Sequence, residues 1–358
     1  MLRTLYCVLF AVAFCVPSFC GDWDPKLAAK YLDERQKRWF EWPIAKAAGG
    51  PCVSCHTGLP YLLARPHLRK ALGETTKTQF ETGLLDGLQT RLQSGESMFK
   101  SFKNEPLRSE GLCVEAVLSV IALGTNEDVP KQTAKAKTTA AWDRLWSLEN
   151  PVGARRDKEL WPWFNLELHP YESEASAYYA ASLVAVAAGR DLTRSERHHS
   201  GAQLRSLTDY MRQNFPNQPL HNRLMALWAS AKLPGIVDRP GRDNLLREIW
   251  QLQEPDGGWP IAALGSWTDR QAKPESTGSN AYGTALVSFT LQQAGVACND
   301  PRLERAKGWL KSHQDPQTGA WSAPSMNKQF PKTSIQVGFM DDAATGFAVL
   351  ALLDPGGC

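Results

Sequence analysis

The chain has 358 residues, 43% of them hydrophobic, so it can bury a large core and is expected to be globular. Its 40 basic and 37 acidic residues are spread along the chain and leave a net charge of only +3. This balance excludes a strongly basic surface, so nucleic acid is not expected as a partner.

The first 20 residues have the features of a secretory signal peptide. A basic start at Arg3 is followed by an apolar run over 5–16, a break at Pro17 and small residues near Cys20. Because the run is shorter than the roughly 20 residues that span a bilayer, a stable anchor is not expected, nor is any later spanning segment. We therefore predict a periplasmic protein, cleaved near residue 20, with no stable membrane insertion.

The next feature is the motif CVSCH at 52–56. Cys52 and Cys55 have the spacing that adds to the two vinyl groups of a haem, with the thiols one helical turn apart. His56 then follows as the proximal ligand of the iron. The motif predicts one covalently bound haem c.

The motif has three other interpretations: a zinc site, a thioredoxin-like pair and a plain disulfide. A zinc site would need a second ligand pair at comparable spacing, and the sequence has none. A thioredoxin-like pair would need a preceding strand and a βαβ pattern, and a plain disulfide between Cys52 and Cys55 would leave His56 unexplained. Among the remaining cysteines of the exported chain, at most one disulfide can form, and we choose Cys298 with Cys358.

The sixth ligand of the iron is open. The haem-bearing stretch contains no methionine, so the candidates are His67 or a residue from the rest of the chain. His169 is the first choice, because aromatic residues surround it in WPWFNLELHPYESE, and Met98 is a weaker candidate. A five-coordinate iron is the alternative, and it would favour ligand binding or catalysis over electron transfer.

Nearby, Glu172 and Glu174 precede a predicted helix, where carboxylates complement the helix dipole. Glu172 is also a candidate hydrogen-bond partner or proton relay beside the haem.

Downstream, two kinds of helix alternate. Apolar runs rich in small residues, each ending at a glycine, are predicted at 113–124, 175–189, 223–235, 281–295 and 343–356. Amphipathic helices are predicted between them at 78–93, 139–148, 206–215, 244–253 and 303–313. Two further helices at 25–40 and 61–72 would nearly close a ring.

The predicted fold is therefore all-α. We expect an α/α toroid of about five to six helix pairs, with small apolar helices inside and charged amphipathic helices outside. The predicted domains are a signal peptide at 1–20, a short haem-bearing helical segment at 21–75 and the toroid at 76–358.

Two turns repeat the pattern Q-x-x-x-G-x-W, the second with one insertion. The first contains Gln253, Gly257 and Trp259, and the second contains Gln314, Gly319 and Trp321. The glutamine is expected to close a helix end, the glycine to permit a tight turn and the tryptophan to fill the gap between repeats. These residues are predicted to be structural.

These turns resemble the QW repeats of the terpenoid-cyclase and prenyltransferase superfamily, in particular the C-terminal toroid of squalene-hopene cyclases. The similarity is clearest over about 142–352, and LWSLENPVGARRDKELWPWF resembles a degenerate earlier copy. The stretch CVSCHTGLPYLLARP resembles the haem-bearing start of exported bacterial proteins that join a c-type haem motif to such a toroid. The resemblance implies the fold more strongly than an activity.

Cyclase activity is not expected, because the D-x-D-D motif that supplies the acid in squalene-hopene cyclases is absent. The nearest match is MDD at 340–342, where Asp341 and Asp342 are expected to cap backbone N–H groups. We predict electron transfer with a redox partner protein or a small electron carrier, serving the oxidation or reduction of an apolar molecule held by the toroid. The alternative is a haem-containing binding or sensor module for an isoprenoid, hopanoid or peptide, and a cyclase ranks last.

Overall fold

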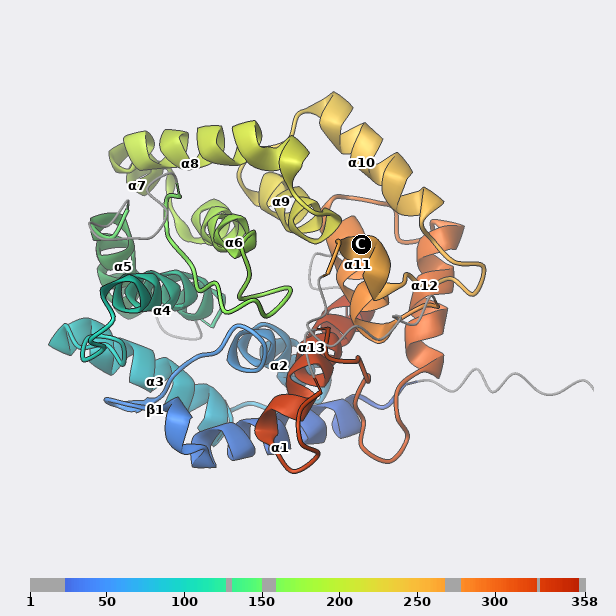
Figure 1. Cartoon of the computed structure of the whole chain (residues 1–358), viewed down its shortest axis with the longest axis horizontal. Coiled ribbons are helices and arrows are strands. Elements are labelled where there is room, and N and C mark those ends of the chain that lie inside the picture. The colour runs from blue at the N-terminus through green and yellow to red at the C-terminus, as the bar shows by residue number, and fades with distance from the viewer. Residues whose placement is uncertain (1–22, 127–130, 150–158, 268–277, 327–328, 354–358) are drawn as a thin grey trace, which may run out of the picture.

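The computed structural model describes residues 23–126, 131–149, 159–267, 278–326 and 329–353, so the predicted signal peptide lies outside the described residues. Within these ranges, outer and inner helices alternate along the chain and form two concentric rings (Figure 1). The all-α toroid is confirmed, and the described sheet is limited to β1 (Lys46–Ala47) paired with β2 (Gly50–Pro51).

The outer helices are α1 (Pro25–Glu41), α3 (Gln79–Ser94), α5 (Lys131–Ser147), α8 (Gly201–Asn214), α10 (Arg239–Gln251) and α12 (Pro301–Ser312). The inner helices are α2 (Gly58–Ala71), α4 (Glu105–Thr125), α6 (Ser176–Asp191), α9 (Leu220–Lys232), α11 (Ala281–Gln293) and α13 (Phe339–Leu353). Shorter elements are α7 (Arg194–His199), η1 (Pro43–Ala45), η2 (Phe215–Asn217), η3 (Ile261–Leu264) and η4 (Ile335–Gly338). The loops that lead into inner helices form one end of the ring, here the mouth, and the C-terminal ends of the inner helices form the base.

Composition explains why each helix takes its layer. Every residue of α6 from Ser176 to Ala188 is buried, as is every residue of α11 from Ala281 to Gln292. A helix that is apolar on all sides must be surrounded by protein, and small residues let its neighbours approach. By contrast, α10 buries only Leu245 and Ile249, a single stripe that faces the inner ring.

The N-terminal pair closes the ring. Helix α2 packs between α13 and α4, and α1 covers it from outside (Figure 1). The segment predicted at 21–75 therefore supplies one of six pairs, and its boundary with 76–358 falls between two pairs of one ring. Helix α2 thereby covers the sides of α4 and α13 that face it.

The two QW turns are built alike. The indole N–H of Trp259 donates to Ile249 O at 2.8 Å, and that of Trp321 donates to Leu310 O at 2.8 Å. Both rings are fully buried. In the degenerate copy, Trp161 donates in the same way to Leu145 O at 3.2 Å. Each tryptophan therefore satisfies a carbonyl at the end of the preceding outer helix.

The glutamines join neighbouring repeats. Gln253 donates to Gly257 O within its turn and to Arg302 O at the start of α12, both at 2.9 Å. Gln314 donates to Gly319 O at 3.1 Å and to Asp24 O, the residue before α1, at 3.0 Å. The last repeat is thereby tied to the first helix of the chain.

Glycine ends the helices less often than predicted. Gly124 and Gly189 lie inside α4 and α6, so the prediction that these helices stop there is wrong. A Cβ on Gly189 would lie 2.2 Å from the backbone oxygen of Lys232, so this glycine permits α6 and α9 to touch.

Two further features complete the fold. Ile335–Leu353 is long and apolar enough to cross a membrane by length and composition, which was not expected, but 67% of the tested window is buried inside the ring. Cys298 is disulfide-bonded, and its predicted partner, Cys358, lies outside the described residues.

Candidate functional site

The CVSCH motif lies at the mouth, in the loop that leads into α2. Cys52 donates its backbone N–H to Ala45 O at 2.8 Å, and the Trp39 indole donates to Cys52 O at 2.7 Å. The hydroxyl of Ser54 accepts the backbone N–H of Gly58 at 2.9 Å and so satisfies the first turn of α2. The helix begins only at Gly58, so the two thiols lie in a loop. The sequence had suggested that they lie one helical turn apart.

The motif opens into an apolar cavity of about 340 Å³, called here the cysteine cavity. Its walls come from the α1–α2, α3–α4, α5–α6 and α12–α13 loops and from the adjoining parts of α1, α4 and α13. They include the rings of Trp39, Trp42, Phe99, Phe164, Tyr171, Phe330 and Phe339. Cys52, Cys55 and His56 all line it. The aromatic wall predicted for a haem is therefore present, although most of its rings come from other segments than the one around His169.

Both cysteines are free thiols in the structure. Burial raises the pKa of Cys52 to about 12 and that of Cys55 well above its usual value. Within the described residues, no three His, Cys, Asp or Glu side chains gather as a site for a free metal ion.

His56 is oriented by a buried relay. Its Nδ1 lies 3.1 Å from Thr57 Oγ1, and Thr57 Oγ1 lies 2.6 Å from Asp342 Oδ2. An ionised carboxylate only accepts hydrogen bonds, so the Thr57 hydroxyl donates to Asp342 and accepts a hydrogen bond from the Nδ1–H group of His56. Nε2 is then the unprotonated nitrogen, which is the state that a proximal haem ligand needs.

Two further effects favour this role. The His56 ring stacks on Phe339 with centroids 3.6 Å apart, which fixes the plane of the imidazole. Burial, reinforced by the nearby Arg35 charge, lowers the pKa of His56 to about 3, so the ring is neutral at physiological pH. The donor set therefore fits a haem: two thiols and one oriented, neutral imidazole on an apolar cavity.

Asp342 is itself fixed by buried partners. Arg35 donates to it from Nε at 2.6 Å and from Nη2 at 3.0 Å, and the Tyr31 hydroxyl donates at 3.0 Å. The expectation that Asp341 and Asp342 cap helix N–H groups is therefore wrong for Asp342. Asp341 does accept a backbone N–H, from Ala323 at 2.7 Å, but across a loop.

A short hairpin brings His169 and Glu172 to the same cavity. Leu168 and Glu172 exchange backbone hydrogen bonds at 3.0 and 2.8 Å, and the Trp163 indole donates to Tyr171 O at 2.7 Å. Burial raises the pKa of Glu172 to about 7, and burial also lowers the pKa of His169.

The candidates for the distal iron ligand line two different pockets. His169 and Met98 both line the cysteine cavity. His67 lines a different pocket at the base of the ring, which removes it as a ligand because the ring separates the two ends. Glu174 lines a neighbouring pocket and not the cysteine cavity.

A buried hydrogen-bonded chain that sequence reasoning missed runs from this cavity through the ring. Tyr171 OH lies 2.8 Å from Tyr282 OH, which lies 2.9 Å from His221 Nε2, and His221 Nδ1 lies 3.0 Å from Asn222 Oδ1. Asn222 Nδ2 donates to Ala175 O at 2.8 Å, so Oδ1 must accept from His221. His221 Nε2 then accepts a hydrogen bond from the Tyr282 hydroxyl, which in turn accepts one from the Tyr171 hydroxyl. The backbone carbonyl of Ala175 therefore fixes the direction of every hydrogen bond in this series.

The far end of this chain lies at a second, polar pocket of about 610 Å³. This polar pocket shares His169 with the cysteine cavity and is also lined by His221, Glu174 and Trp267. Arg223 and Glu248 form a bidentate ion pair on its wall, with both distances 2.6 Å. The mouth therefore holds an apolar cavity and a polar pocket side by side.

Exposed large hydrophobic side chains gather at the mouth. Among the described residues they are Ile44, Phe102, Leu166 and Val337, which are 66, 38, 45 and 41% exposed. Ile44 and Leu166 line the cysteine cavity, Phe102 contacts the cavity residue Phe99, and Val337 lies between cavity residues Gln336 and Phe339. We call these four side chains the apolar collar.

The fold and site define an α/α toroid with a cysteine-bearing apolar cavity at its mouth. No family model and no curated protein matches the chain. Among solved structures, it is similar to the unsaturated glucuronyl hydrolase of Bacillus sp. GL1, described as responsible for glycosaminoglycan degradation, with a TM-score of 0.51 and 11% identity. That match covers 92% of this chain and 96% of the other.

A polysaccharide lyase is also similar, with a TM-score of 0.36 and 12% identity over 93% of this chain and 89% of the other, which is too low to support an argument. At 11% identity, the hydrolase supports the toroid fold alone.

Proposed function

We propose that the chain is an exported c-type haem protein that transfers electrons. One haem would be attached through Cys52 and Cys55, with His56 as the proximal ligand and His169 as the distal candidate. When bound, the haem would supply a one-electron couple. The observation that carries this proposal is the Thr57–Asp342 relay, which leaves Nε2 of His56 unprotonated on an apolar, aromatic cavity.

The cavity favours electron transfer over open-site chemistry. It presents two side chains, His169 and Met98, of the types that complete a six-coordinate haem iron. The alternative, a sensor or binding module for an apolar ligand, requires that neither side chain binds the iron. Coordination number is therefore the property that separates the two functions.

The apolar collar supports contact with a redox partner protein. Electron-transfer partners bind weakly over small interfaces, and an exposed apolar ring around the cofactor supplies such a contact. Ile44, the most exposed member, sits directly on the cavity edge. An Ile44→Glu variant is expected to slow electron exchange with the partner while the haem spectrum stays unchanged.

The deciding experiment is an absorption spectrum of the purified, exported protein in both redox states, with and without carbon monoxide. We expect a six-coordinate, low-spin spectrum that carbon monoxide does not alter, and an open site that binds the gas in His169→Ala. Met98→Leu is the matched control and should behave as wild type. A wild-type haem that binds carbon monoxide directly would support the sensor or catalytic alternative.

The polar pocket favours a second candidate function, which is saccharide binding. It combines an aromatic ring, Trp267, with the carboxylates of Glu174 and Glu248, the groups that commonly bind sugar faces and hydroxyls. Calorimetry with an unsaturated glucuronyl disaccharide, on wild type and Trp267→Ala, tests it; no heat of binding would remove it.

A further inference from the structure

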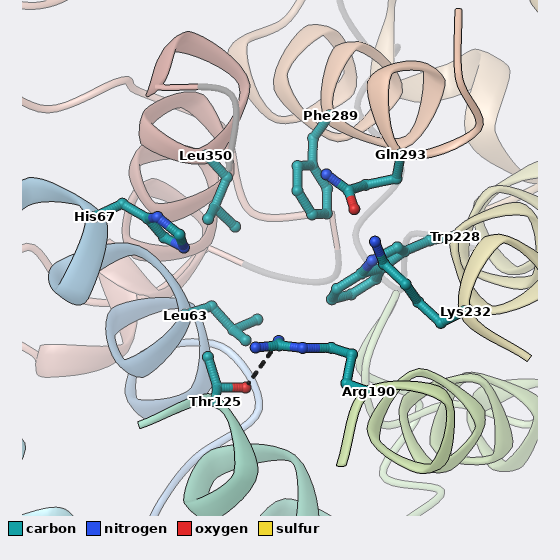
Figure 2. Close-up of a pocket in the computed structure, with 9 residues that line it drawn as sticks. All are labelled: Leu63, His67, Thr125, Arg190, Trp228, Lys232, Phe289, Gln293 and Leu350. Carbon is teal, nitrogen blue, oxygen red and sulfur yellow. Dashed lines mark hydrogen bonds between the residues drawn. The ribbon is translucent and has the colours of Figure 1, made fainter. Parts of the chain in front are cut away.

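A third pocket lies at the base of the ring, at the opposite end from the cysteine cavity. It has a volume of about 120 Å³, and side chains from all six inner helices line it. Figure 2 shows His67, Arg190 and Lys232 around the pocket, together with Thr125 and the rings of Trp228 and Phe289. We call it the basal pocket.

The basal pocket is strongly one-sided in charge. Two positively charged side chains, Arg190 and Lys232, line it together with the imidazole of His67, and within the part of the chain that the structure describes no carboxylate lines it. Asp191, the residue after Arg190, lies against Gly124 and is not part of the lining. Arg190 is exposed to solvent, and Lys232 and His67 are half-buried.

These cations are not used to satisfy helix ends. The carbonyls of Ala188 and Ala229, near the ends of α6 and α9, accept backbone N–H groups from Leu192 and Leu233. Arg190 donates to Thr125 Oγ1 at 3.2 Å, and among the described residues Lys232 has no hydrogen bond or ion pair. Donor capacity is therefore left over in the pocket.

The electrostatics agree with this geometry. Burial, and then the charge of Arg190, lower the pKa of Lys232, and the same two causes, with Lys70, lower the pKa of His67. Each shift means that burial and the neighbouring positive charges disfavour a positive charge on that group.

We propose that the basal pocket binds a small organic oxyanion, with its charged group between Arg190 and Lys232 and its apolar part on Trp228 and Phe289. A planar carboxylate fits both halves, because a guanidinium binds a carboxylate bidentately and aromatic rings pack on an apolar ring. Inorganic phosphate carries the same negative charge but has no apolar part to pack on Trp228 and Phe289. The site is independent of the haem.

Titration calorimetry of the mature protein at constant ionic strength tests the proposal, with benzoate, acetate and phosphate as separate probes. We expect one benzoate per chain, weaker acetate, and a loss of at least about tenfold in benzoate affinity in Arg190→Gln and in Lys232→Gln. Lys70→Gln is the matched control for loss of a nearby positive charge, because Lys70 lies at the same end of α2 but outside the pocket, and it should lower benzoate affinity far less than the two pocket variants.

Lys232→Met keeps the aliphatic stem and provides a second variant should a glutamine variant fold poorly. Phosphate binding more tightly than benzoate would overturn the role assigned to Trp228 and Phe289. Saturable binding of none of the three probes, or binding that the charge-removing variants leave unchanged, would overturn the site.

Discussion

The relay behind His56 makes a quantitative prediction for Asp342→Asn. The Asp342 carboxylate is 1% exposed, pairs with Arg35 at 2.6 Å, and joins α13 to α1 and to the start of α2. Removing one partner of a buried ion pair leaves the other charge uncompensated, which costs about 3–5 kcal/mol. Because asparagine retains one acceptor, we expect a loss of about 3 kcal/mol in the free energy of unfolding.

Equilibrium urea unfolding of the mature protein, followed by tryptophan fluorescence and circular dichroism, measures this loss. The transition midpoint should fall with an unchanged slope. Asp341→Asn is the matched neighbour and should cost about 1 kcal/mol, because it alters only a partly buried hydrogen-bonded loop contact.

A double-mutant cycle with Arg35→Gln separates the pair from its surroundings. The two changes together should cost about 1–3 kcal/mol less than their sum, since the second removes a charge that the first has already left unpaired. A cost below about 1 kcal/mol for Asp342→Asn, the value of an exposed pair, would refute a buried relay that holds the first and last helices together.

Three further predictions follow from the mouth and the ring. His169→Ala should convert a low-spin to a high-spin haem spectrum, measured by absorption and electron paramagnetic resonance; an unchanged spectrum would exclude this ligand. The haem midpoint potential should fall by up to about 59 mV per pH unit near pH 7, because reduction favours the protonated form of Glu172, whose buried carboxyl has a pKa of about 7. Glu172→Gln should flatten that slope in a redox titration, whereas a slope that persists would assign it to another group. Gly319→Ala should lower the free energy of unfolding by at least about 1 kcal/mol, since φ of Gly319 is +82° and the added Cβ would lie 2.3 Å from the backbone of Leu27. Gly308→Ala should raise it by about 0.5–1 kcal/mol, because Gly308 lies on a helix and its added Cβ would meet no other atom. Thermal unfolding of the two variants compares them, and equal effects would argue against the close contact at the QW turn.

Most inner helices could be predicted to within a few residues because burial on all sides leaves a compositional signal, although α4 begins at Glu105 and was predicted from 113. Helix α11 was predicted at 281–295 and spans Ala281–Gln293. The starts of other helices were predicted late. Helix α10 begins at Arg239 and not at 244, because the side chain of Asp238 caps it, and caps do not alter apolar periodicity.

Helix α7 was missed, although its start carries a readable signal. Thr193 and Glu196 form a capping box, but this helix has only six residues and buries none of them, so no periodicity accompanies it. Ring closure through α1 and α2 was only partly foreseen, since it depends on contacts between the two ends of the chain.

The residues of the candidate site were likewise predicted only in part. Cys52, Cys55 and His56 were found because the chemistry of haem attachment fixes their spacing. Asp342 was assigned a local capping role, because nothing in the sequence indicates that it meets Thr57, 285 residues away. Tyr171 and Tyr282, 111 residues apart, were missed for the same reason.

The central claim is that this ring holds a covalent haem at its mouth. The most direct measurement is a pyridine haemochrome spectrum, with intact mass, of the exported wild type and of the Cys52→Ala/Cys55→Ala variant. We predict one haem per mature chain in the wild type, with the added mass on the protein, and none in the variant. A folded, exported wild-type chain that carries no haem mass would contradict the account.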